Sequence, residues 1–555
     1  MVWFLAVGLA GASDVSAWLF AGLQEYTDLD SVQTPWQYLH GLRQADEKTF
    51  TEQFEAEFRL LLDEKQQAAY DTIATITEKK AFIEHYWKST NPNPILPQND
   101  WLLDFLRRRA FVRKYFPAFK PPYFDDRGKF YLKYGPPTHR YEYYPELDAN
   151  RVSRNYTILP NESWSYWNID RNIVVHFVQQ GSVFKEAESL IEAIVIPVGR
   201  EARAYVWADL VERRAWISPM LEQVQVEILW QVEAQEHASE RSLLRKLLMS
   251  PVEEIYKLQR DVEWRMDNIR EEMPVTAYDP VRAINKLDFY NRIAQFRAPD
   301  GGTRVEVALL APFRENLAGE YWMEAPDTVD VEFRGLLQNE HFEDVAEDAM
   351  TTNVPLQVAA ATRLSHAVGE LVFALAPQQG SLTLQVKNRR KDEIGFLRQE
   401  FQVRDFGGDT LQVSDVRFFA EVKDPKQARI LPTRTQDGLQ LAPYPYMEVK
   451  RSTPIVCYFE VYNLQTAGFG QEYEISYTLS RDKTPGNFLK RLFGSGGKSV
   501  SVAYQQPVQG NVATETIILD LRQVSPGTHR LEITVTDPRD RTKTVKTWRE
   551  FKIVD

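Results

Sequence analysis

Hydrophobic residues recur at helical spacing through roughly the first 120 residues, which predicts a helical N-terminal region. Within it, Thr75 and Glu78 have the spacing of a capping box, in which a hydroxyl and a carboxylate bind free backbone N–H groups at a helix start. The Asn-Pro-Asn-Pro sequence at residues 91–94 predicts the end of that helix, because proline lacks an N–H and disfavours helical geometry in the residue before it. Asn99 or Asp100 is expected to cap the next helix.

A two-residue alternation follows this helical region. In Lys129–Tyr134 the residues Phe130, Leu132 and Tyr134 fall on one face of an extended chain, which predicts a strand that ends at the following Gly-Pro-Pro sequence. Residues 164–166 and 173–178 are further strand candidates. Helices followed by a small sheet predict an α+β domain over residues 18–200.

A second helical patch is predicted for residues 238–273, inside a connecting segment at 201–274. Ser250 and Pro251 combine an N-cap with proline at the first helical position, and Pro274 closes the patch. The positions expected to form its buried face are Ile255, Leu258, Val262, Met266 and Ile269.

From about residue 275 onward the pattern alternates as in strands, and it repeats. Leu382, Leu384 and Val386 recur 149 residues later as Leu531, Ile533 and Val535. Phe401 and Val403 recur as Phe551 and Ile553, and Glu306-Val307 recurs as Glu460-Val461. Alternating strands repeated in this way predict two antiparallel β-sandwich domains of the immunoglobulin or fibronectin type, at residues 275–405 and 406–555.

Composition and charge narrow the class of protein. A chain of 555 residues with 43% hydrophobic residues is too long for one core and is expected to form several domains. Its net charge of −12 argues against a nucleic-acid partner, because phosphate binding needs clustered Lys and Arg. Cys457 is the single cysteine, so no internal disulfide can form, and its apolar neighbours predict a buried thiol.

The apolar run Met1–Ala12 is too short to span a bilayer, and no later segment reaches the length of a transmembrane helix. The sequence Val15-Ser16-Ala17 suits a signal-peptidase cut, so residues 1–17 are predicted to be a signal peptide and the protein to be exported, periplasmic or extracellular. No Lys or Arg precedes the run, which a wrongly assigned start codon would explain. A buried N-terminal helix is the alternative.

The stretch from Tyr86 to Pro137 contains a recognisable succession of residues: Trp87, Asn99, Asp126, Arg127, Gly128, Tyr131, Tyr134, Gly135 and Pro136. It resembles the GWxTD-domain family, bacterial exported proteins whose signature runs into Asp-Arg-Gly, a short strand and a Tyr-Gly-Pro-Pro turn. The resemblance implies export and a β-rich tail, but no activity, since the family has no agreed one. Pro122, Tyr123 and Asp125 replace the Gly, Trp and Thr of the signature, whereas Asp126 is retained.

The Asp126-Arg127-Gly128 turn is the best candidate for chemistry. Asp126 with the neighbouring Asp125 could act as acid and base or hold a calcium ion, and Gly128 could supply a positive φ. The structural alternative is that Asp126 and Arg127 pair and brace the turn. The histidines form no His-Glu-x-x-His pair, and no Gly-x-Ser-x-Gly elbow occurs. A dense group of aromatic residues between 123 and 167 fits either a binding platform or the core of a small sheet.

The organisation favours an exported, non-enzymatic interaction or scaffolding protein of the cell envelope, because tandem sandwiches present loops as binding surfaces. One alternative is a hydrolase acting on a cell-envelope polymer or peptide, with Asp126 as the acidic residue and Arg127 orienting it. Another is a subunit of a larger envelope assembly that docks through the 238–273 patch. A protein partner is expected and no cofactor is predicted; calcium binding at Asp125 and Asp126 stays open.

Overall fold

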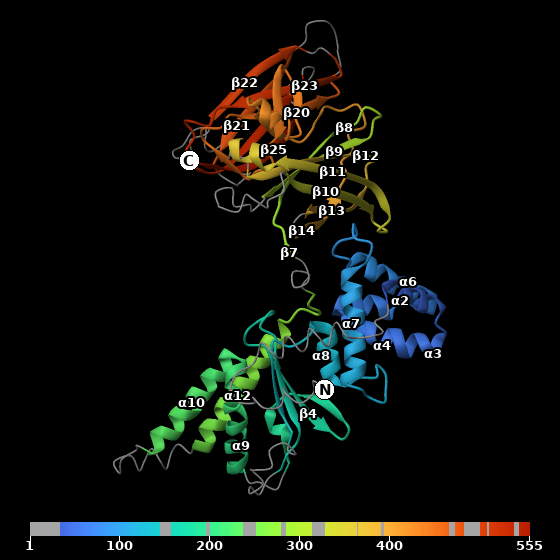
Figure 1. The fold of residues 1–555 in the computed structure, drawn as a ribbon, viewed down its shortest axis with the longest axis vertical. Helices are drawn as coiled ribbons and strands as arrows, with labels where there is room; N and C mark the ends of the chain where they lie inside the picture. The colour runs from blue at the N-terminus through green and yellow to red at the C-terminus, as the bar shows by residue number, and fades with distance from the viewer. Residues whose placement is uncertain are drawn as a thin grey trace. The chain divides into compact units, whose positions relative to one another are not determined.

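The computed structural model describes residues 34–144, 157–195, 200–236, 251–278, 285–312, 328–362, 365–389, 393–464, 472–481, 500–507, 510–537 and 543–555 (Figure 1). The chain divides into two compact units, one of residues 1–91 and 98–280 and the other of residues 92–97 and 281–555. The predicted signal peptide and the expected N-cap Ser250 lie outside the described residues.

The first unit begins with helices, as predicted. They are α2 (Pro35–Gln44), α3 (Glu47–Phe50), α4 (Ala56–Phe58), α5 (Glu64–Asp71), α6 (Ile76–Ser89), α7 (Asp100–Tyr115) and α8 (Asp126–Tyr134), with a π-helical turn at Thr51–Glu55 and a 3₁₀ turn at Arg59–Leu61. The capping box at the start of α6 is confirmed, with Thr75 Oγ1 accepting from the Glu78 N–H at 3.2 Å. Asn99 caps α7 and also donates from Nδ2 to the Trp87 carbonyl at 2.5 Å.

The predicted strand over Lys129–Tyr134 is wrong, because these residues belong to helix α8. Asp125 is the N-cap of that helix, and its carboxylate accepts from the backbone N–H groups of Arg127 and Gly128. Gly135 ends the helix with a φ of 77°, a conformation that glycine adopts without a steric penalty.

A small antiparallel sheet of order β1-β3-β4-β5 follows the helices. Its strands are β1 (His139–Tyr143), β3 (Asn161–Ser165), β4 (Val174–Gln180) and β5 (Val183–Ala187), and β2 (Thr157–Ile158) pairs with β6 (Ile194–Val195) beside them. The predicted strands at 164–166 and 173–178 therefore exist. The helices and the sheet share one aromatic core that includes Trp164 and Tyr166, both with no exposed surface, so these two rings fill the core.

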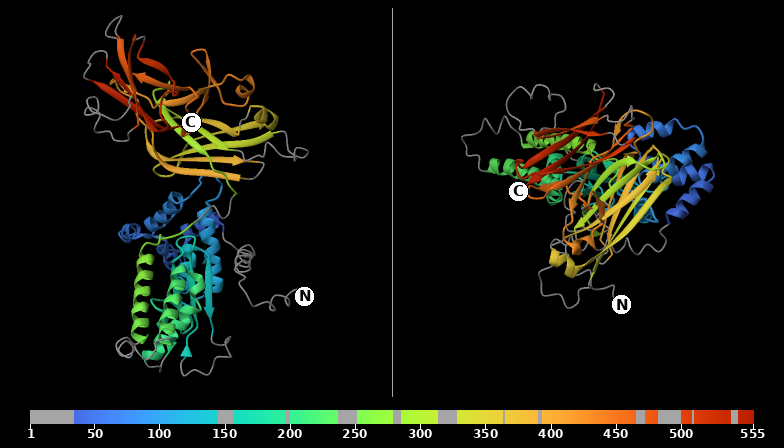
Figure 2. Two further views of the ribbon diagram at one scale, coloured as in Figure 1. Left: turned by 90° about the vertical axis from the view of Figure 1, so that its left-hand side faces the viewer. Right: turned by 90° about the horizontal axis from the view of Figure 1, so that it is seen from above.

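Three long helices complete the first unit: α9 (Arg200–Glu212), α10 (Pro219–Glu236) and α12 (Pro251–Glu271), with 3₁₀ turns at Leu190–Ala193 and Ala215–Ile217. They pack against one another and lie side by side, in green, in Figure 1 and in the left view of Figure 2. The predicted helical patch is confirmed for residues 251–271. Ile255, Val262 and Met266 are buried in a second core, whereas Leu258 is partly exposed.

The second unit consists mainly of antiparallel strands in two successive groups. The first group is β7 (Asn285–Lys286), β8 (Tyr290–Arg297), β9 (Thr303–Pro312), β10 (Thr328–Asn339), β11 (Asp344–Pro355), β12 (His366–Leu375), β13 (Gln379–Asn388) and β14 (Glu393–Gln402), with helix α13 (Leu356–Thr362). They form a sheet of order β11-β10-β13-β14-β7 and a sheet of order β12-β9-β8, with one apolar core contributed by both.

The second group of strands contains a five-stranded sheet whose strand order is equivalent to that of the five-stranded sheet in the first group. Its strands are β15 (Gln412–Val413), β16 (Arg417–Glu421), β17 (Arg434–Gln436), β18 (Leu439–Pro443), β19 (Glu448–Lys450), β20 (Ile455–Tyr462), β21 (Glu472–Ser480), β22 (Val500–Pro507), β23 (Val512–Leu519), β24 (Gly527–Thr536) and β25 (Thr544–Val554), with helix α14 (Pro425–Ala428). One sheet has the order β22-β21-β24-β25-β19, and the other contains β15, β20, β16, β18, β17 and β23. Both contribute to one core that encloses Cys457, which is fully buried as predicted.

The repeat seen in the sequence corresponds to equivalent strand pairs. Leu382 of β13 lies opposite Gln399 of β14, and Leu531 of β24 lies opposite Arg549 of β25, so the offsets of 149 and 150 residues preserve the register. In both groups the last strand of the five-stranded sheet, β7 or β19, pairs in parallel, unlike the others. We call strands β7–β14 the first repeat and β15–β25 the second repeat.

The two repeats meet at a buried cluster of charges inside the second unit. Glu306 of β9 and its repeat counterpart Glu460 of β20 are both buried, and Arg304 binds both carboxylates at 2.9 and 2.8 Å. The hydroxyls of Tyr458 and Tyr462 also donate to Glu460, at 2.6 and 2.7 Å. Paired in this way, the carboxylates are buried without an uncompensated charge.

Candidate functional site

The turn that the sequence singled out contains a buried ion pair, but between different residues than expected. Arg127 does not pair with Asp126. Its guanidinium binds Asp125, with Nη2 at 2.7 Å and Nε at 3.1 Å from Oδ2, and it binds Glu162 of β3 through Nη1 at 2.6 Å. Asp125 Oδ2 also accepts from the backbone N–H of Phe184 in β5 at 3.1 Å. The start of α8 is therefore joined to both β3 and β5.

Glu162 lies at the centre of this cluster, and its side chain has no exposed surface. Besides Arg127, its carboxylate accepts from Arg140 Nε at 2.9 Å, from the Tyr144 hydroxyl at 2.9 Å and from Trp164 Nε1 at 2.8 Å. Burial alone would raise the pKa of Glu162, but Arg140 and Arg127 outweigh it and hold the pKa below its ordinary value. A fully buried carboxylate that is ionised and saturated with donors stabilises the fold and does not reach a substrate.

Asp126 points to other partners. Its Oδ2 accepts from the Glu186 backbone N–H at 3.0 Å, and its Oδ1 binds Lys129 Nζ at 2.7 Å, with Lys185 Nζ at 3.8 Å. Burial favours a higher pKa for Asp126, but the hydrogen bonds from Lys129 and Glu186 lower it overall. A general acid needs the opposite shift, towards the working pH. The geometry of Asp126 is that of a brace between α8 and β5.

Gly128 serves close packing and not a positive φ, which corrects the expectation from the sequence. It lies inside α8, and a Cβ atom there would come within 2.6 Å of the Phe124 ring. The other motif residues are distributed through the core. Trp87 and Tyr131 are buried there, with Tyr131 stacked on Phe111 at 4.4 Å between centroids. Tyr134 meets Tyr166 edge to face, whereas Pro136 is exposed.

A second polar cluster, which the sequence did not predict, joins the sheet to the long helices. Ser163 Oγ lies 2.8 Å from His176 Nδ1 and accepts from Arg214 Nε at 2.7 Å; Arg214 also binds the Asn161 side chain. Burial and then Arg214 hold the pKa of His176 well below its ordinary value. A neutral histidine beside a serine resembles a nucleophile with its base. The cavity beside His176 is only about 10 Å³, however, which leaves no room for a substrate.

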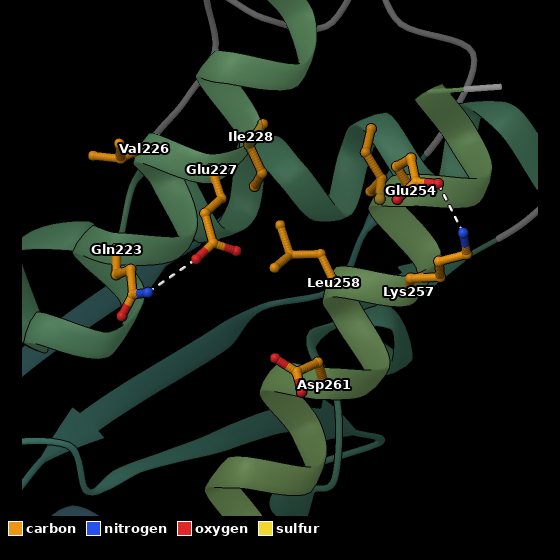
Figure 3. Close-up of a pocket in the computed structure, with 9 residues that line it drawn as sticks. Gln223, Val226, Glu227, Ile228, Glu254, Lys257, Leu258 and Asp261 are labelled. Carbon is orange, nitrogen blue, oxygen red and sulfur yellow. Dashed lines mark hydrogen bonds and ion pairs between the residues drawn. The ribbon is translucent and has the colours of Figure 1, made fainter. Parts of the chain in front are cut away.

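An open groove between α10 and α12 has a volume of about 650 Å³ (Figure 3). Its lining residues are Gln223, Val226, Glu227 and Ile228 of α10, and Glu254, Ile255, Lys257, Leu258 and Asp261 of α12. Figure 3 shows Ile228 and Leu258 pointing toward one another across the gap. Apolar side chains therefore lie at its centre, and charged side chains lie along both of its walls.

Comparison with known proteins assigns this chain to no family. No protein-family model matches the chain, and no curated protein matches its sequence. Within the described ranges, no group of three or more His, Cys, Asp or Glu side chains is placed to hold a metal ion. None of the helices in those ranges is long and apolar enough to cross a membrane.

Proposed function

We propose that this chain is an exported, non-enzymatic interaction or scaffolding protein of the cell envelope, and that it docks a protein partner on the α10–α12 groove. The groove carries the proposal, because Val226 and part of Leu258 are exposed at its mouth above the buried Ile228 and Ile255, and its volume is large enough to receive side chains of another molecule. Docking through the helical patch, expected from the sequence as a separate possibility, becomes part of the same function.

The proposed architecture is a GWxTD-like α+β domain followed by two immunoglobulin-like or fibronectin-like β-sandwiches. In support of the sandwiches, each repeat has two antiparallel sheets that contribute to one apolar core. In support of the family, Asp125 caps α8 at the position where the signature has Thr, and Thr and Asp are both favourable N-caps. The substitution at that position thus preserves the local structure.

The alternative hypothesis, a hydrolase that acts through Asp126, has less support than the scaffolding function. Asp126 is ionised and engaged with Lys129 and the β5 backbone, and Arg127 is occupied by Asp125 and Glu162. Neither side chain is free to donate a proton or to orient the other. An Asp126→Asn variant that loses a hydrolytic activity while its fold stays intact would favour the enzyme over the scaffold.

Site-specific crosslinking tests the proposal. In one variant of this chain, a photoreactive residue replaces Val226, which is 46% exposed on the groove wall. In the control variant, the photoreactive residue replaces Val372, which is 44% exposed on β12. In cells of the native source, only the Val226 position is expected to give a discrete crosslinked product.

Leu258→Arg, which places a charge at the centre of the groove, should abolish that product. Trp264→Arg changes an exposed residue on another face of the same helix and should leave it unchanged. A product that persists in the Leu258→Arg protein, or none at Val226, would contradict the proposed function.

A further inference from the structure

We propose that the occupant of the α10–α12 groove is a basic, amphipathic α-helix of the partner protein, an inference that rests on the proposed function and names the class of partner. The walls of the groove are built from one stripe of each helix. On α10 the lining residues Val226 and Glu227 follow Gln223 by three and four positions, and on α12 Glu254, Leu258 and Asp261 are spaced four and three positions apart. Residues so spaced lie along one face of a helix.

The shape of the site favours a helix over an extended peptide. Both walls are helices, whose backbone N–H and C=O groups are bonded within the helix, so the groove offers no free ladder of donors and acceptors. An extended peptide laid there would leave its own backbone groups unpaired against apolar side chains such as Ile228 and Leu258. A helix satisfies its own backbone, and its side chains can pack between the two walls.

The charged residues of the groove indicate which charge the polar face of the ligand helix carries. The lining residues include three carboxylates, those of Glu227, Glu254 and Asp261, and one cation, Lys257; Arg265, which is not a lining residue, pairs with Asp261. Helix α10 as a whole contains four acidic residues and no basic one. A ligand helix with an apolar stripe flanked by Lys or Arg would place its cations beside carboxylates on both walls, as flanking charges do in coiled coils. The same negative charge disfavours a nucleic acid or an anionic membrane as the occupant.

The existing ion pairs of the rim do not block this role. Lys257 binds Glu254 at 2.8 Å and Arg265 binds Asp261 at 2.5 Å, each within one turn of α12, and Gln223 binds Glu227 at 2.9 Å. The side chains of Lys257 and Arg265 are 60% and 41% exposed. Exposed pairs within a helix contribute little and exchange readily for an intermolecular partner.

Synthetic helices with defined charge test the inference on the full-length protein. The probe is a fluorescein-labelled peptide of Leu and Lys with the length of α10, 18 residues, whose leucines form one helical stripe. A matched peptide replaces every Lys with Glu, and a third has the Leu and Lys residues in scrambled order. Fluorescence anisotropy is expected to show binding of the Lys peptide and at least about tenfold weaker binding of the other two.

Two variants locate the binding. Leu258→Arg should abolish binding of the Lys peptide, and the double variant Glu254→Lys, Asp261→Lys should reverse the preference in favour of the Glu peptide. Raised salt should weaken binding of the Lys peptide, because the rim charges are exposed and screened. Equal binding of the Lys and Glu peptides, or binding that Leu258→Arg leaves intact, would overturn the inference.

The sequence offers one competing occupant, since residues 241–249 of this chain contain three basic residues among leucines. A variant with Arg241, Arg245 and Lys246 changed to Gln is titrated in parallel. Binding of the Lys peptide only to that variant would mean that the chain fills its own groove, and would refute the partner helix. If no peptide binds but the Val226 crosslinked product still forms, only the inference of a basic helix is rejected. If no peptide binds and no crosslinked product forms, the proposed function is rejected as well.

Discussion

Removal of the Glu162 carboxylate should destabilise the first unit more than any other single charge removal at the predicted turn. Four donors converge on this buried group, from Arg127, Arg140, Tyr144 and Trp164, at 2.6 to 2.9 Å. Breaking a buried ion pair by deleting one partner costs about 3–5 kcal/mol, because the remaining charge is left without compensation. We expect about 4 kcal/mol for Glu162→Ala, because two buried cations lose a partner at once, while the carboxylate that Arg127 and Arg140 each keep limits the loss.

Urea unfolding monitored by tryptophan fluorescence measures this loss. Eleven of the 13 tryptophans belong to the first unit, so the fluorescence change reports mainly on that unit. With a denaturant slope of about 2 kcal/mol per molar, a loss of about 4 kcal/mol lowers the midpoint by roughly 2 M. Glu142→Gln is the control, because Glu142 binds Arg140 from a half-exposed position and should cost less than about 1 kcal/mol.

The pH dependence gives an independent check. The pKa of Glu162 is lowered in the folded state from its ordinary value of 4.5, so its contribution is fully present above pH 4.5 and is lost as the pH falls through the lower folded value. The stability gap between the wild type and Glu162→Gln should therefore narrow below pH 4.5. A midpoint shift for Glu162→Ala no larger than that of the control, or a gap that widens in acid, would refute the assigned role.

Three further outcomes are expected. Gly128→Ala should lower the stability of the first unit by about 1–3 kcal/mol in the same urea assay, because the added Cβ overlaps the Phe124 ring; a neutral change would contradict the packing argument. Cys457 should resist thiol reagents in the native protein, since complete burial raises its pKa, and labelling should appear only with unfolding of the second unit; rapid native labelling would disprove this. Asp126→Asn should keep the fold by circular dichroism and cost roughly 1 kcal/mol, because Asn can still accept from the Glu186 N–H; collapse of the fold would show a larger structural role.

The sequence predicted those elements in which one periodicity dominates. The apolar alternation of Leu382, Leu384 and Val386, repeated 149 residues later, corresponds to equivalent strands in equivalent registers. The identity of the sandwiches and the boundaries between domains stay predictions.

Helix α8 was missed because its sequence satisfies two periods at once. Phe130, Leu132 and Tyr134 alternate as in a strand. The buried positions, however, are Arg127, Gly128, Tyr131, Leu132 and Tyr134, of which the first four follow the three- and four-residue spacing of a helix. An N-cap at Asp125 and a glycine just beyond the last helical residue were readable start and stop signals, and they would have decided between the two.

The composition of the candidate site could not be read from local sequence. Glu162 lies 35 residues from Arg127 and within a strand, Asn161–Ser165, that is buried on both faces and so shows no alternation. The Ser163–His176 contact depends on the register between β3 and β4, which no short motif encodes. The groove depends on how α10 packs beside α12; from sequence only the amphipathic character of α12 was visible.

The salt bridges of Arg304 couple the two repeats, so we expect the two repeats to be inherited together. Glu306 and Glu460 occupy matching places in the duplicated strands, and one arginine serves both. A chimera that took the first repeat from another protein would leave the buried Glu460 of the second repeat without Arg304, and removing a carboxylate from water without its cation costs several kcal/mol. Recombination in this region should therefore preserve the pair, and natural variation at these two glutamates should be correlated.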